Sequence, residues 1–483
     1  LCPLLSDGAI EALLTAGSDE LKAVYLEKLV SGQWTGTMNL TEPQAGSDLA
    51  MVRSRAEPQP DGSYKVFGTK IFITYGEHDM AENIVHLVLA RVTGAPEGVK
   101  GISLFVVPKF LVNKDGTLGA RNDVHCVSIE HKLGIKASPT AVLQYGDGTA
   151  AKDVNGTGPG AVGYLVGEEN RGLEYMFIMM NSARYAVGMQ GIAIAERAYQ
   201  KAVAFAKDRV QSRPVDGSIK ASAPIIHHPD VKRMLMTMRA YTEGCRAMAS
   251  VAAAAYDAAH HHPDAEVRKQ NAAFYEFMVP LVKGYSTEMS LDVTSLGVQV
   301  HGGMGFIEET GAAQYLRDAK ILTIYEGTTA IQANDLVGRK TSRDGGQTAK
   351  AIAKQIEATE TELLQQGSAD AVAVAKRLKA ARLAFVDVVD FVAGNSKASP
   401  NAVFAGSVPY LMLAGNVVAG WQLARSLLVA QEQLAQGVDA GFMKAKITTA
   451  RFYADHLLTK APGVRDSIVE GADSVTALAL EAF

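Results

Sequence analysis

The sequence contains little cysteine, and the cysteines it has are scattered. Only Cys2, Cys126 and Cys245 occur in 483 residues, and no two of them form a C-x-x-C pair. Disulfide-rich folds and cysteine-rich zinc sites need clustered cysteines at regular spacing. The sequence therefore excludes both classes and favours a reducing, cytoplasmic compartment.

An excess of charge of either sign is also absent. Lysine and arginine together number 47 against 51 aspartates and glutamates, which gives a net charge of −4. Nucleic acids and anionic membranes attract proteins through a general basic surface. Because this composition offers no such surface, we expect no nucleic-acid partner.

Long hydrophobic runs are absent as well. A membrane-spanning helix needs about 20 consecutive apolar residues, whereas the most apolar stretch, residues 408–424, contains Pro409, Asn416 and Gln422. We interpret it as a buried bundle helix and expect no membrane insertion. The chain starts with leucine, and residues 1–14 carry two acids and no basic residue, unlike a signal peptide. We therefore expect that the chain begins inside a longer protein.

A metal site is not predicted either. The run of His260, His261 and His262 is followed by Pro263 and Asp264, and no second group of ligands stands at a spacing typical of metal sites. We interpret this run as the solvated end of a helix.

What is present is the composition of a globular protein of several domains. Hydrophobic residues make up 48% and charged residues 20% of a 51.3 kDa chain. Residues 18–30 have the apolar spacing of an amphipathic helix. Residues 34–166 form short β-rich runs between turn signals, which predicts an antiparallel β domain. The fold class we expect is α+β multidomain, with this β domain followed by an antiparallel helical bundle and a further all-α domain.

The helical half is predicted from long runs rich in alanine, methionine and leucine. A polar segment with two glycines, residues 341–347, divides these runs and predicts a linker. The predicted helices are residues 173–209, 228–260 and 265–296 before the linker, and 348–364, 369–394, 410–436, 440–460 and 463–482 after it.

The most specific local feature is IYEGTTAIQ at residues 324–332. Thr329 and Gln332 have the spacing of a capping box, so we expect a helix to begin at Thr329 after a turn at Gly327. Glu326 would then lie at an irregular junction behind apolar residues, where desolvation raises a carboxyl pKa towards that of a base working near neutral pH. The alternative is a solvated loop glutamate, which the local sequence alone favours because structural carboxylates outnumber catalytic ones.

Two further segments are rich in glycine and hydroxyl groups. VHGGMG at residues 300–305 follows a helical run, and NLTEPQAGSD at residues 39–48 opens the β domain. Glycine lets a backbone approach a phosphate or a nucleotide closely, and small hydroxyl donors could hold a polar ligand. The alternatives are an interhelical turn for the first segment, and for the second a surface turn in which Ser47 and Asp48 bond their own backbone.

In their order and separation, these segments resemble the flavin-dependent acyl-CoA dehydrogenase family from residue 1 to about residue 340. TEPQAGSD at residues 41–48 matches the family's β-domain signature, and Phe72-Ile73-Thr74 stands where the family usually has tryptophan-isoleucine-threonine. Arg209 matches its dimer-crossing arginine, and Glu326 matches its catalytic base. By this resemblance the FAD contacts are Leu40, Thr41, Gly46, Ser47, Phe72, Thr74, Arg209, Gln299, Gly302, Gly303 and Thr328. The implied substrate contacts are Ser47, Arg184 and Gly327.

The resemblance also implies a domain order. The tail resembles the extra helical domain of a bacterial subgroup of longer acyl-CoA dehydrogenases, which includes enzymes for fatty acyl-CoA and for methylthiopropanoyl-CoA. We expect a remnant of the family's N-terminal helical domain at residues 1–33 and a flavin-binding β domain at 34–166. A helical bundle with the base is expected at 167–340, and a C-terminal helical domain at 341–483.

An activity and partners follow from the same resemblance. Glu326 would take the α-proton of a saturated acyl-CoA while the β-hydride passes to N5 of FAD, which gives a trans-2-enoyl-CoA. The implied partners are a second copy of the chain, as a dimer or tetramer, and an electron-transfer flavoprotein. The alternatives are an acyl-CoA oxidase and a non-catalytic or DNA-damage-response flavoprotein of the same fold. For Arg184 the alternative is a structural ion pair.

Overall fold

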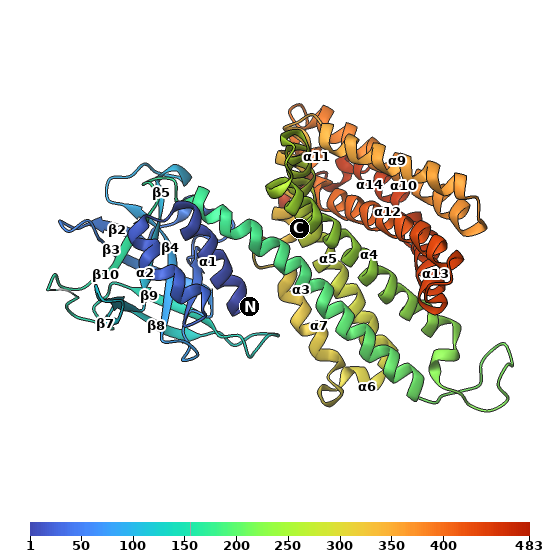
Figure 1. Cartoon of the computed structure of the whole chain (residues 1–483), viewed down its shortest axis with the longest axis horizontal. Coiled ribbons are helices and arrows are strands. Elements are labelled where there is room, and N and C mark those ends of the chain that lie inside the picture. Colours follow the sequence, from blue (N-terminus) through green and yellow to red (C-terminus); the bar gives the residue numbers. More distant parts are fainter. Residues whose placement is uncertain (155) are drawn as a thin grey trace. The chain divides into compact units, whose positions relative to one another are not determined.

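The computed structural model describes residues 1–154 and 156–483 and divides into two compact units. Unit 1 comprises Leu1–Ala183 and holds two helices and the β-sheet, and unit 2 comprises Arg184–Phe483 and is helical (Figure 1). Helix α3 (Gly172–Asp208) belongs in part to each. The predicted class, a β domain followed by a bundle and further helices, is confirmed.

Two helices open unit 1. The predicted helix at residues 18–30 is α2 (Asp19–Val30), and the side chain of Ser18 caps it by accepting a hydrogen bond from the Leu21 amide. Helix α1 (Cys2–Ala16) was not predicted. It packs on the first strand, where a Cβ on Gly36 would lie 2.5 Å from Cβ of Ala9. Only glycine permits this close approach of helix and strand.

The sheet of unit 1 is mixed rather than wholly antiparallel. Its strands run in the order β1-β4-β5-β10-β3-β9-β8, with β2 beside β3 and β4. The pairings of β1 and of β2 with β4 are parallel, which corrects the predicted pairing. Parallel neighbours need a crossover connection, and β2 and β3 supply it between β1 and β4. The strands are β1 (Trp34–Asn39), β2 (Arg55–Pro58), β3 (Tyr64–Thr74), β4 (Asn83–Val92), β5 (Ile102–Pro108), β8 (Val124–Ile129), β9 (Thr140–Tyr145) and β10 (Ala161–Val166), and β6 (Phe110–Val112) pairs separately with β7 (Leu118–Arg121).

The bundle of unit 2 begins with three long helices, as predicted. After α3 come α4 (Pro229–His261) and α5 (Ala265–His301), which pack together over their length. Shorter pieces follow and position Glu326: α6 (Gly303–Phe306), α7 (Ala312–Lys320) and α8 (Thr329–Asp335), continued by a π-helix (Leu336–Ser342).

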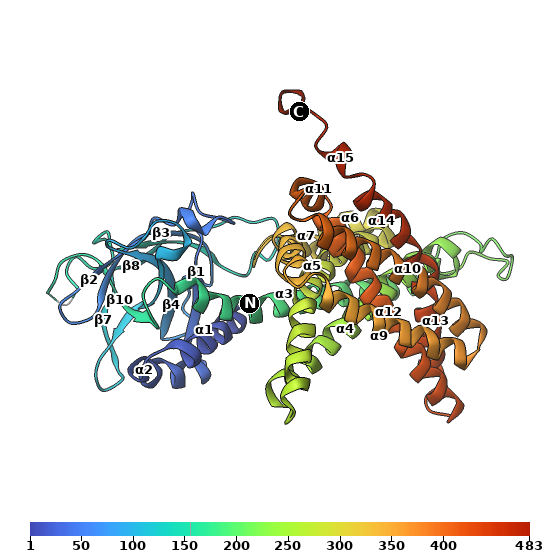
Figure 2. The ribbon, with the colours of Figure 1, turned by 90° about the horizontal axis from the view of Figure 1, so that it is seen from above.

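The C-terminal helices share one hydrophobic core with the bundle. Helix α12 (Ser407–Ala435) is largely buried, as predicted for residues 408–424, and it packs against α4 and α5 as well as α10, α13 and α14 (Figure 2). Among the described residues no helix is long and apolar enough to cross a membrane. The remaining helices are α9 (Gln347–Gln366), α10 (Ala369–Asn395), α11 (Pro400–Ala405), α13 (Ala440–His456), α14 (Ala461–Val469) and α15 (Ala472–Val475).

Two helical predictions need correction. The segment 341–347 is no spacer, because Thr341 is fully buried within the π-helix and its hydroxyl lies 3.0 Å from that of Tyr410. The predicted helix at 463–482 is broken: α14 ends at Val469 and a short α15 follows Gly471. Most residues beyond Ala472 are exposed, so no packing extends the helix.

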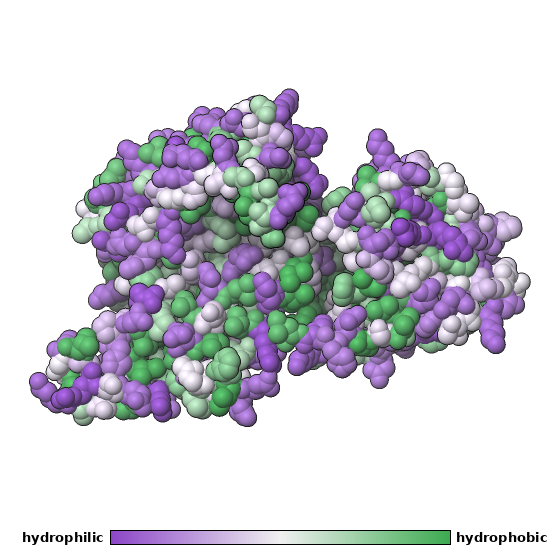
Figure 3. Space-filling view, turned by 180° about the vertical axis from the view of Figure 1, so that it is seen from behind, coloured by the Kyte–Doolittle hydropathy of each residue, from purple (hydrophilic) through white to green (hydrophobic). Residues whose placement is uncertain are grey.

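On the face shown in Figure 3, hydrophobic residues are interspersed with hydrophilic ones.

Candidate active site

Glu326 lies in a strained turn between two helical pieces of unit 2. The segment Ile321–Thr323 is a 3-10 helix, α8 starts at Thr329, and Glu326 between them has φ +55°. A glutamate in the left-handed region costs about 1–3 kcal/mol, and such strain persists only where the surroundings hold it. The predicted irregular junction is confirmed.

The cap of α8 is Thr328, one residue before the predicted position. Its hydroxyl accepts a hydrogen bond from the amide of Ile331 at 3.3 Å. Thr329 is instead the first helical residue, and its hydroxyl donates to Glu288 of α5 at 2.5 Å. Gln332 points back to the turn and donates to the carbonyl oxygens of Glu326 and Gly327 at 3.3 and 3.4 Å. The hydroxyl of Thr329 is thus bonded to Glu288, and Thr328 serves as the cap.

The carboxylate of Glu326 is desolvated but not bonded. Burial raises its pKa to about 7, against the opposing effect of the positive charges of Lys283 and Arg184. Within residues 1–154 and 156–483, no group donates a hydrogen bond to this carboxylate, and its backbone N–H has no acceptor. A carboxylate with this pKa and no partner can accept a proton near neutral pH.

Two buried cations, Lys283 and Arg184, lie near this turn. Nζ of Lys283, on α5, donates to the carbonyl oxygen of Gly327 at 2.6 Å. Arg184 lies 3.7 Å from Asp335 in a buried ion pair, and Asp335 also pairs with Arg339 at 2.7 Å. This geometry supports the structural alternative for Arg184, so its direct contact with substrate stays a prediction. Sequence reasoning missed Lys283, although a single lysine in the apolar run FMVPLVKGY was a signal.

In unit 1, a buried ion pair organises the signature at residues 40–48. Nζ of Lys70 donates to Glu42 at 2.7 Å and to the carbonyl oxygen of Leu40 at 3.1 Å. Glu42 also accepts from the amides of Arg53 and Ser54 at 2.8 and 3.1 Å. Burial raises the pKa of Glu42, but the Lys70 ammonium and these hydrogen bonds lower it below its usual value.

The ion pair also connects the two predicted flavin segments of this unit. The amide of Ile71 donates to the carbonyl oxygen of Thr41 at 3.0 Å. A β-bulge interrupts the pairing of β3 with β9 after Lys70, and Phe72 in the bulge has φ +60° and is 60% exposed. The structure thus brings Leu40 and Thr41 beside the C-terminal end of β3, which carries Phe72 and Thr74.

In unit 2, Arg209 and the turn at Gln299–Gly303 lie at the same end of the bundle. The rings of Phe205 on α3 and His301 on α5 stack with centroids 4.4 Å apart. Arg209 follows Phe205 by one helical turn, and its amide donates to the Phe205 carbonyl at 2.8 Å. Arg209, Gln299, Gly302 and Gly303 are exposed.

These residues fit a flavin dinucleotide. Among the described residues, the hydroxyls of Thr41, Ser47 and Thr74 and the guanidinium of Arg209 have no hydrogen-bond partner, so their donors are available. A Cβ on Gly46, Gly302 or Gly303 would meet no atom within 4 Å, which leaves the backbone open to a ligand. Within unit 1 the hydroxyls lie with the open Gly46, and within unit 2 Arg209 lies at the same end of the bundle as the open Gly302 and Gly303; each set by itself offers donors suited to part of FAD.

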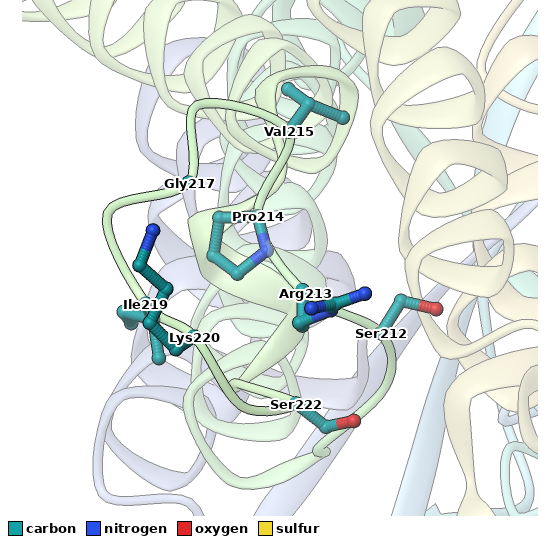
Figure 4. Close-up of a pocket in the computed structure, with 8 residues that line it drawn as sticks. All are labelled: Ser212, Arg213, Pro214, Val215, Gly217, Ile219, Lys220 and Ser222. Atoms are coloured by element: carbon teal, nitrogen blue, oxygen red, sulfur yellow. The ribbon is translucent and has the colours of Figure 1, made fainter.

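A separate hollow of about 580 Å³ lies in the loop between α3 and α4 (Figure 4). The two ends of the loop are joined by backbone hydrogen bonds, among them one from the amide of Gln211 to the carbonyl of Ala223 at 3.0 Å. The loop alone lines this hollow, and Glu326 takes no part in it. Its lining residues are Ser212, Arg213, Pro214, Val215, Gly217, Ile219, Lys220 and Ser222. In the part of the chain that the structure describes, no group of three or more histidine, cysteine or acidic side chains could hold a metal.

Three family profiles of known proteins match successive segments of the chain. The family profile "Acyl-CoA dehydrogenase, middle domain" matches residues 37–147, and "Acyl-CoA dehydrogenase, C-terminal domain" matches residues 170–340. A third profile, "Acetyl-CoA dehydrogenase C-terminal like", matches residues 349–479. The predicted domain limits stay predictions.

Individual relatives are similar over nearly the whole chain. The chain is 58% identical to 3-methylmercaptopropionyl-CoA dehydrogenase of Ruegeria pomeroyi over 480 residues, which cover 99% of this chain and 79% of that protein. It is 37% identical to the broad-specificity linear acyl-CoA dehydrogenase of Mycobacterium tuberculosis, covering 97% and 77%. An acyl-CoA dehydrogenase of Bacillus anthracis crystallised with FAD shares the fold, with a TM-score of 0.74 at 21% identity and coverage of 98% and 74%.

The fold and the site together define a flavoprotein oxidoreductase. The chain belongs to the acyl-CoA dehydrogenase family, and it is an FAD-dependent enzyme acting on acyl-CoA. The predicted family, cofactor and enzyme class are confirmed. The relatives named above are dehydrogenases, which supports this class over the oxidase and the non-catalytic flavoprotein.

Proposed function

We propose that the enzyme dehydrogenates 3-methylmercaptopropionyl-CoA at its α and β carbons, with Glu326 as the base. The identity of 58% to the Ruegeria pomeroyi enzyme supports this substrate. The observation that carries the base is the unpartnered carboxylate of Glu326 with a pKa of about 7. The product would be the corresponding trans-2-enoyl-CoA, in which the sulfur is conjugated with the new double bond.

The chemistry needs an acidified α-carbon and a base beside it. The α-proton of a thioester is a weak acid, and hydrogen bonds to the thioester oxygen stabilise the charge that develops there. The free amide N–H of Glu326 can donate to this oxygen while its carboxylate takes the proton. FAD, when bound, supplies the acceptor for the β-hydride. By the resemblance, Gly327 contacts the substrate, and it also lets the turn pack closely on α8, because a Cβ there would lie 2.8 Å from Nε2 of Gln332.

By the resemblance, each unit carries FAD contacts of its own. In unit 1, Leu40, Thr41, Gly46, Ser47, Phe72 and Thr74 supply the ring and ribityl contacts, and Ser47 also contacts the substrate. In unit 2, Thr328 supplies a hydroxyl beside the base. Phe72 replaces the family's tryptophan, so it offers an apolar ring without an N–H donor. These roles rest on the resemblance and on the free donors described above.

Replacing Glu326 by glutamine tests the proposal. Glu326→Gln keeps the shape of the side chain but removes the proton acceptor, so FAD and acyl-CoA should bind while flavin reduction falls by about 10²–10⁴-fold or more. Stopped-flow absorbance of the flavin measures the rate, and the spectral shift on ligand binding checks that the substrate is bound. Glu309→Gln, on the exposed surface of the same unit, is the matched control. Undiminished reduction in Glu326→Gln contradicts the assignment.

The substrate needs its own measurement. Flavin reduction by 3-methylmercaptopropionyl-CoA, butyryl-CoA and longer acyl-CoAs is compared under anaerobic conditions. We expect the highest kcat/KM for the sulfur-containing substrate. A clear preference for a longer chain would leave Glu326 as the base and overturn only the substrate.

We further propose a homodimer, or a tetramer of such dimers, with an electron-transfer flavoprotein as the acceptor. In the family, Arg209 and the Gln299–Gly303 turn contact FAD across the subunit interface, and both are exposed in this chain. Arg209→Ala should weaken FAD retention by about 1.5–3 kcal/mol, the contribution of a charge-assisted hydrogen bond. FAD content after dialysis measures this effect. A monomer that retains FAD in analytical ultracentrifugation would contradict the dimer.

A further inference from the structure

A buried lysine on α5 holds the backbone next to Glu326. Lys283 is fully buried, and its Nζ donates to the carbonyl oxygen of Gly327 at 2.6 Å. No carboxylate lies within ion-pair distance of Nζ in the described part of the chain. Burying an ammonium without a partner is costly. Among the described residues, the only group bonded to the Lys283 ammonium is the backbone of the turn that carries Glu326.

The turn needs such support because two consecutive residues are left-handed. Glu326 has φ +55° and Gly327 has φ +88°. Three hydrogen bonds restrain the two carbonyl oxygens: one from Lys283 and two from Gln332. A Cβ on Gly327 would lie 2.8 Å from Nε2 of Gln332, so the turn is also closely packed. The bond from Lys283 is the shortest of the three.

Lys283 acts on Glu326 through its charge as well. Its ammonium lowers the pKa of Glu326, and Glu326 in turn raises that of Lys283, which burial brings down to about 8. Other charged groups around this pair are Arg184 from α3, Glu288 from α5, and Asp335 and Arg339 from α8 and the π-helix. Asp335 is paired with both arginines, and Glu288 accepts from Thr329. Lys283 therefore lowers the pKa of Glu326 more than Arg184 does.

We propose that Lys283 is a positioning residue with two separable effects: its hydrogen bond fixes the Glu326–Gly327 turn, and its buried ammonium beside that turn favours the ionised form of Glu326. The inference rests on the proposed role of Glu326 as the base. Without the charge, the carboxylate holds its proton at higher pH. Without the hydrogen bond, the turn and the free N–H of Glu326 lose their fixed orientation.

Three substitutions of Lys283 separate the two effects. Lys283→Met removes charge and donor, Lys283→Gln removes the charge but keeps a donor, and Lys283→Arg keeps both. The readout is the flavin reduction rate with saturating acyl-CoA as a function of pH. Lys269→Met, at an exposed position on the same helix, is the matched control.

In both neutral variants the acid limb of the pH profile should move up by about one unit, so the rate at a pH below the limb falls about tenfold. The rate at high pH should fall further in Lys283→Met than in Lys283→Gln, because only the glutamine can still bond the turn. Lys283→Arg and the control should keep the wild-type limb. An unmoved limb in the neutral variants, or an equal shift in Lys283→Arg, overturns the inference.

A second readout does not depend on turnover. Difference infrared spectroscopy follows the protonated carboxyl band of Glu326 against pH, assigned by its loss in Glu326→Gln. The band should persist to higher pH in whichever neutral variant folds and binds FAD, and an unchanged titration overturns the inference. If Glu326 is not the base, Glu326→Gln reduces flavin normally; if only this inference fails, Glu326→Gln is inactive while the limb does not move.

Discussion

Both units contain a desolvated glutamate and a fully buried lysine, but the two arrangements have opposite effects on the carboxylate. In unit 1, Lys70 donates directly to Glu42, whose pKa lies below its usual value. In unit 2, Lys283 donates to a backbone carbonyl, and burial raises the pKa of Glu326 to about 7. The lysines are alike, because burial lowers the pKa of each to about 8.

The difference shows why desolvation raises the pKa of one carboxylate and is outweighed at the other. Glu42 accepts from Lys70 and from two backbone amides, and each hydrogen bond stabilises the charged form. Glu326 accepts no hydrogen bond from the described residues, so only charge at a distance opposes its desolvation. The first arrangement suits an anion that fixes a loop, and the second suits a group that must take up a proton.

Breaking the ion pair of unit 1 should have the largest effect on stability. Glu42→Ala leaves the ammonium of Lys70 buried without its partner, which costs about 3–5 kcal/mol of the free energy of unfolding. We expect FAD to be lost as well, because Leu40 and Thr41 are held by Lys70 and β3. Urea unfolding and FAD content measure the two effects.

The control for this prediction is the exposed pair of Arg55 and Glu57 on β2. Glu57→Gln should change stability little, since exposed ion pairs contribute little. Replacing Glu42 and Lys70 together by leucine should restore much of the stability lost in Glu42→Ala, because no unpaired charge then remains. A Glu42→Ala protein as stable as wild type would show that the pair does not hold the loop.

The pH dependence of stability should have opposite signs at the two glutamates. The folded pKa of Glu42 is depressed, so its stabilisation is present above its ordinary pKa and is lost as the pH falls. The folded pKa of Glu326 is raised to about 7, so its contribution is favourable at low pH and is lost as the pH rises through about 7. Unfolding of wild type, Glu42→Gln and Glu326→Gln between about pH 3 and about pH 8 measures both.

Relative to wild type, Glu42→Gln should therefore become less harmful as the pH falls, and Glu326→Gln should gain relative stability as the pH rises to about 7, with no further gain above it. Equal slopes for the two variants would contradict the comparison between the units.

Much of the fold could be predicted from the sequence because the signals are local. Periodicity placed α3, α4 and α5 to within a few residues, since each has a long apolar face and a clear start. The parallel pairing of β1 with β4 and the shared core across Thr341 could not be predicted, because both depend on contacts between residues far apart in the sequence. Helix α1 contains Pro3 and Gly8, which weaken its local pattern.

Site residues that belong to a sequence motif could be predicted. A residue that reaches the site only through tertiary packing could not. The YEGTT segment indicated Glu326 and the irregular turn, and TEPQAGSD indicated the loop at residues 41–48. Lys283 is 43 residues before Glu326 and belongs to no motif, so only the fold brings it to the turn. The roles of the predicted FAD residues stay predictions that the substitutions above can test.

The smallest of the expected effects concerns the cap of α8, the helix that follows Glu326. Thr328→Ala removes the hydroxyl that accepts from the amide of Ile331, and the loss of such a cap costs about 0.5–2 kcal/mol. The cap is two residues from Glu326, so a frayed first turn should also loosen Gln332 and lower the rate of flavin reduction. Ser18→Ala removes the corresponding cap of α2 in unit 1, where the serine accepts from Leu21. It should lower stability by a similar amount without changing flavin reduction. If both variants lose stability but neither loses reduction rate, the cap of α8 does not restrain Glu326, and the hydrogen bonds from Lys283 and Gln332 are sufficient to hold the turn.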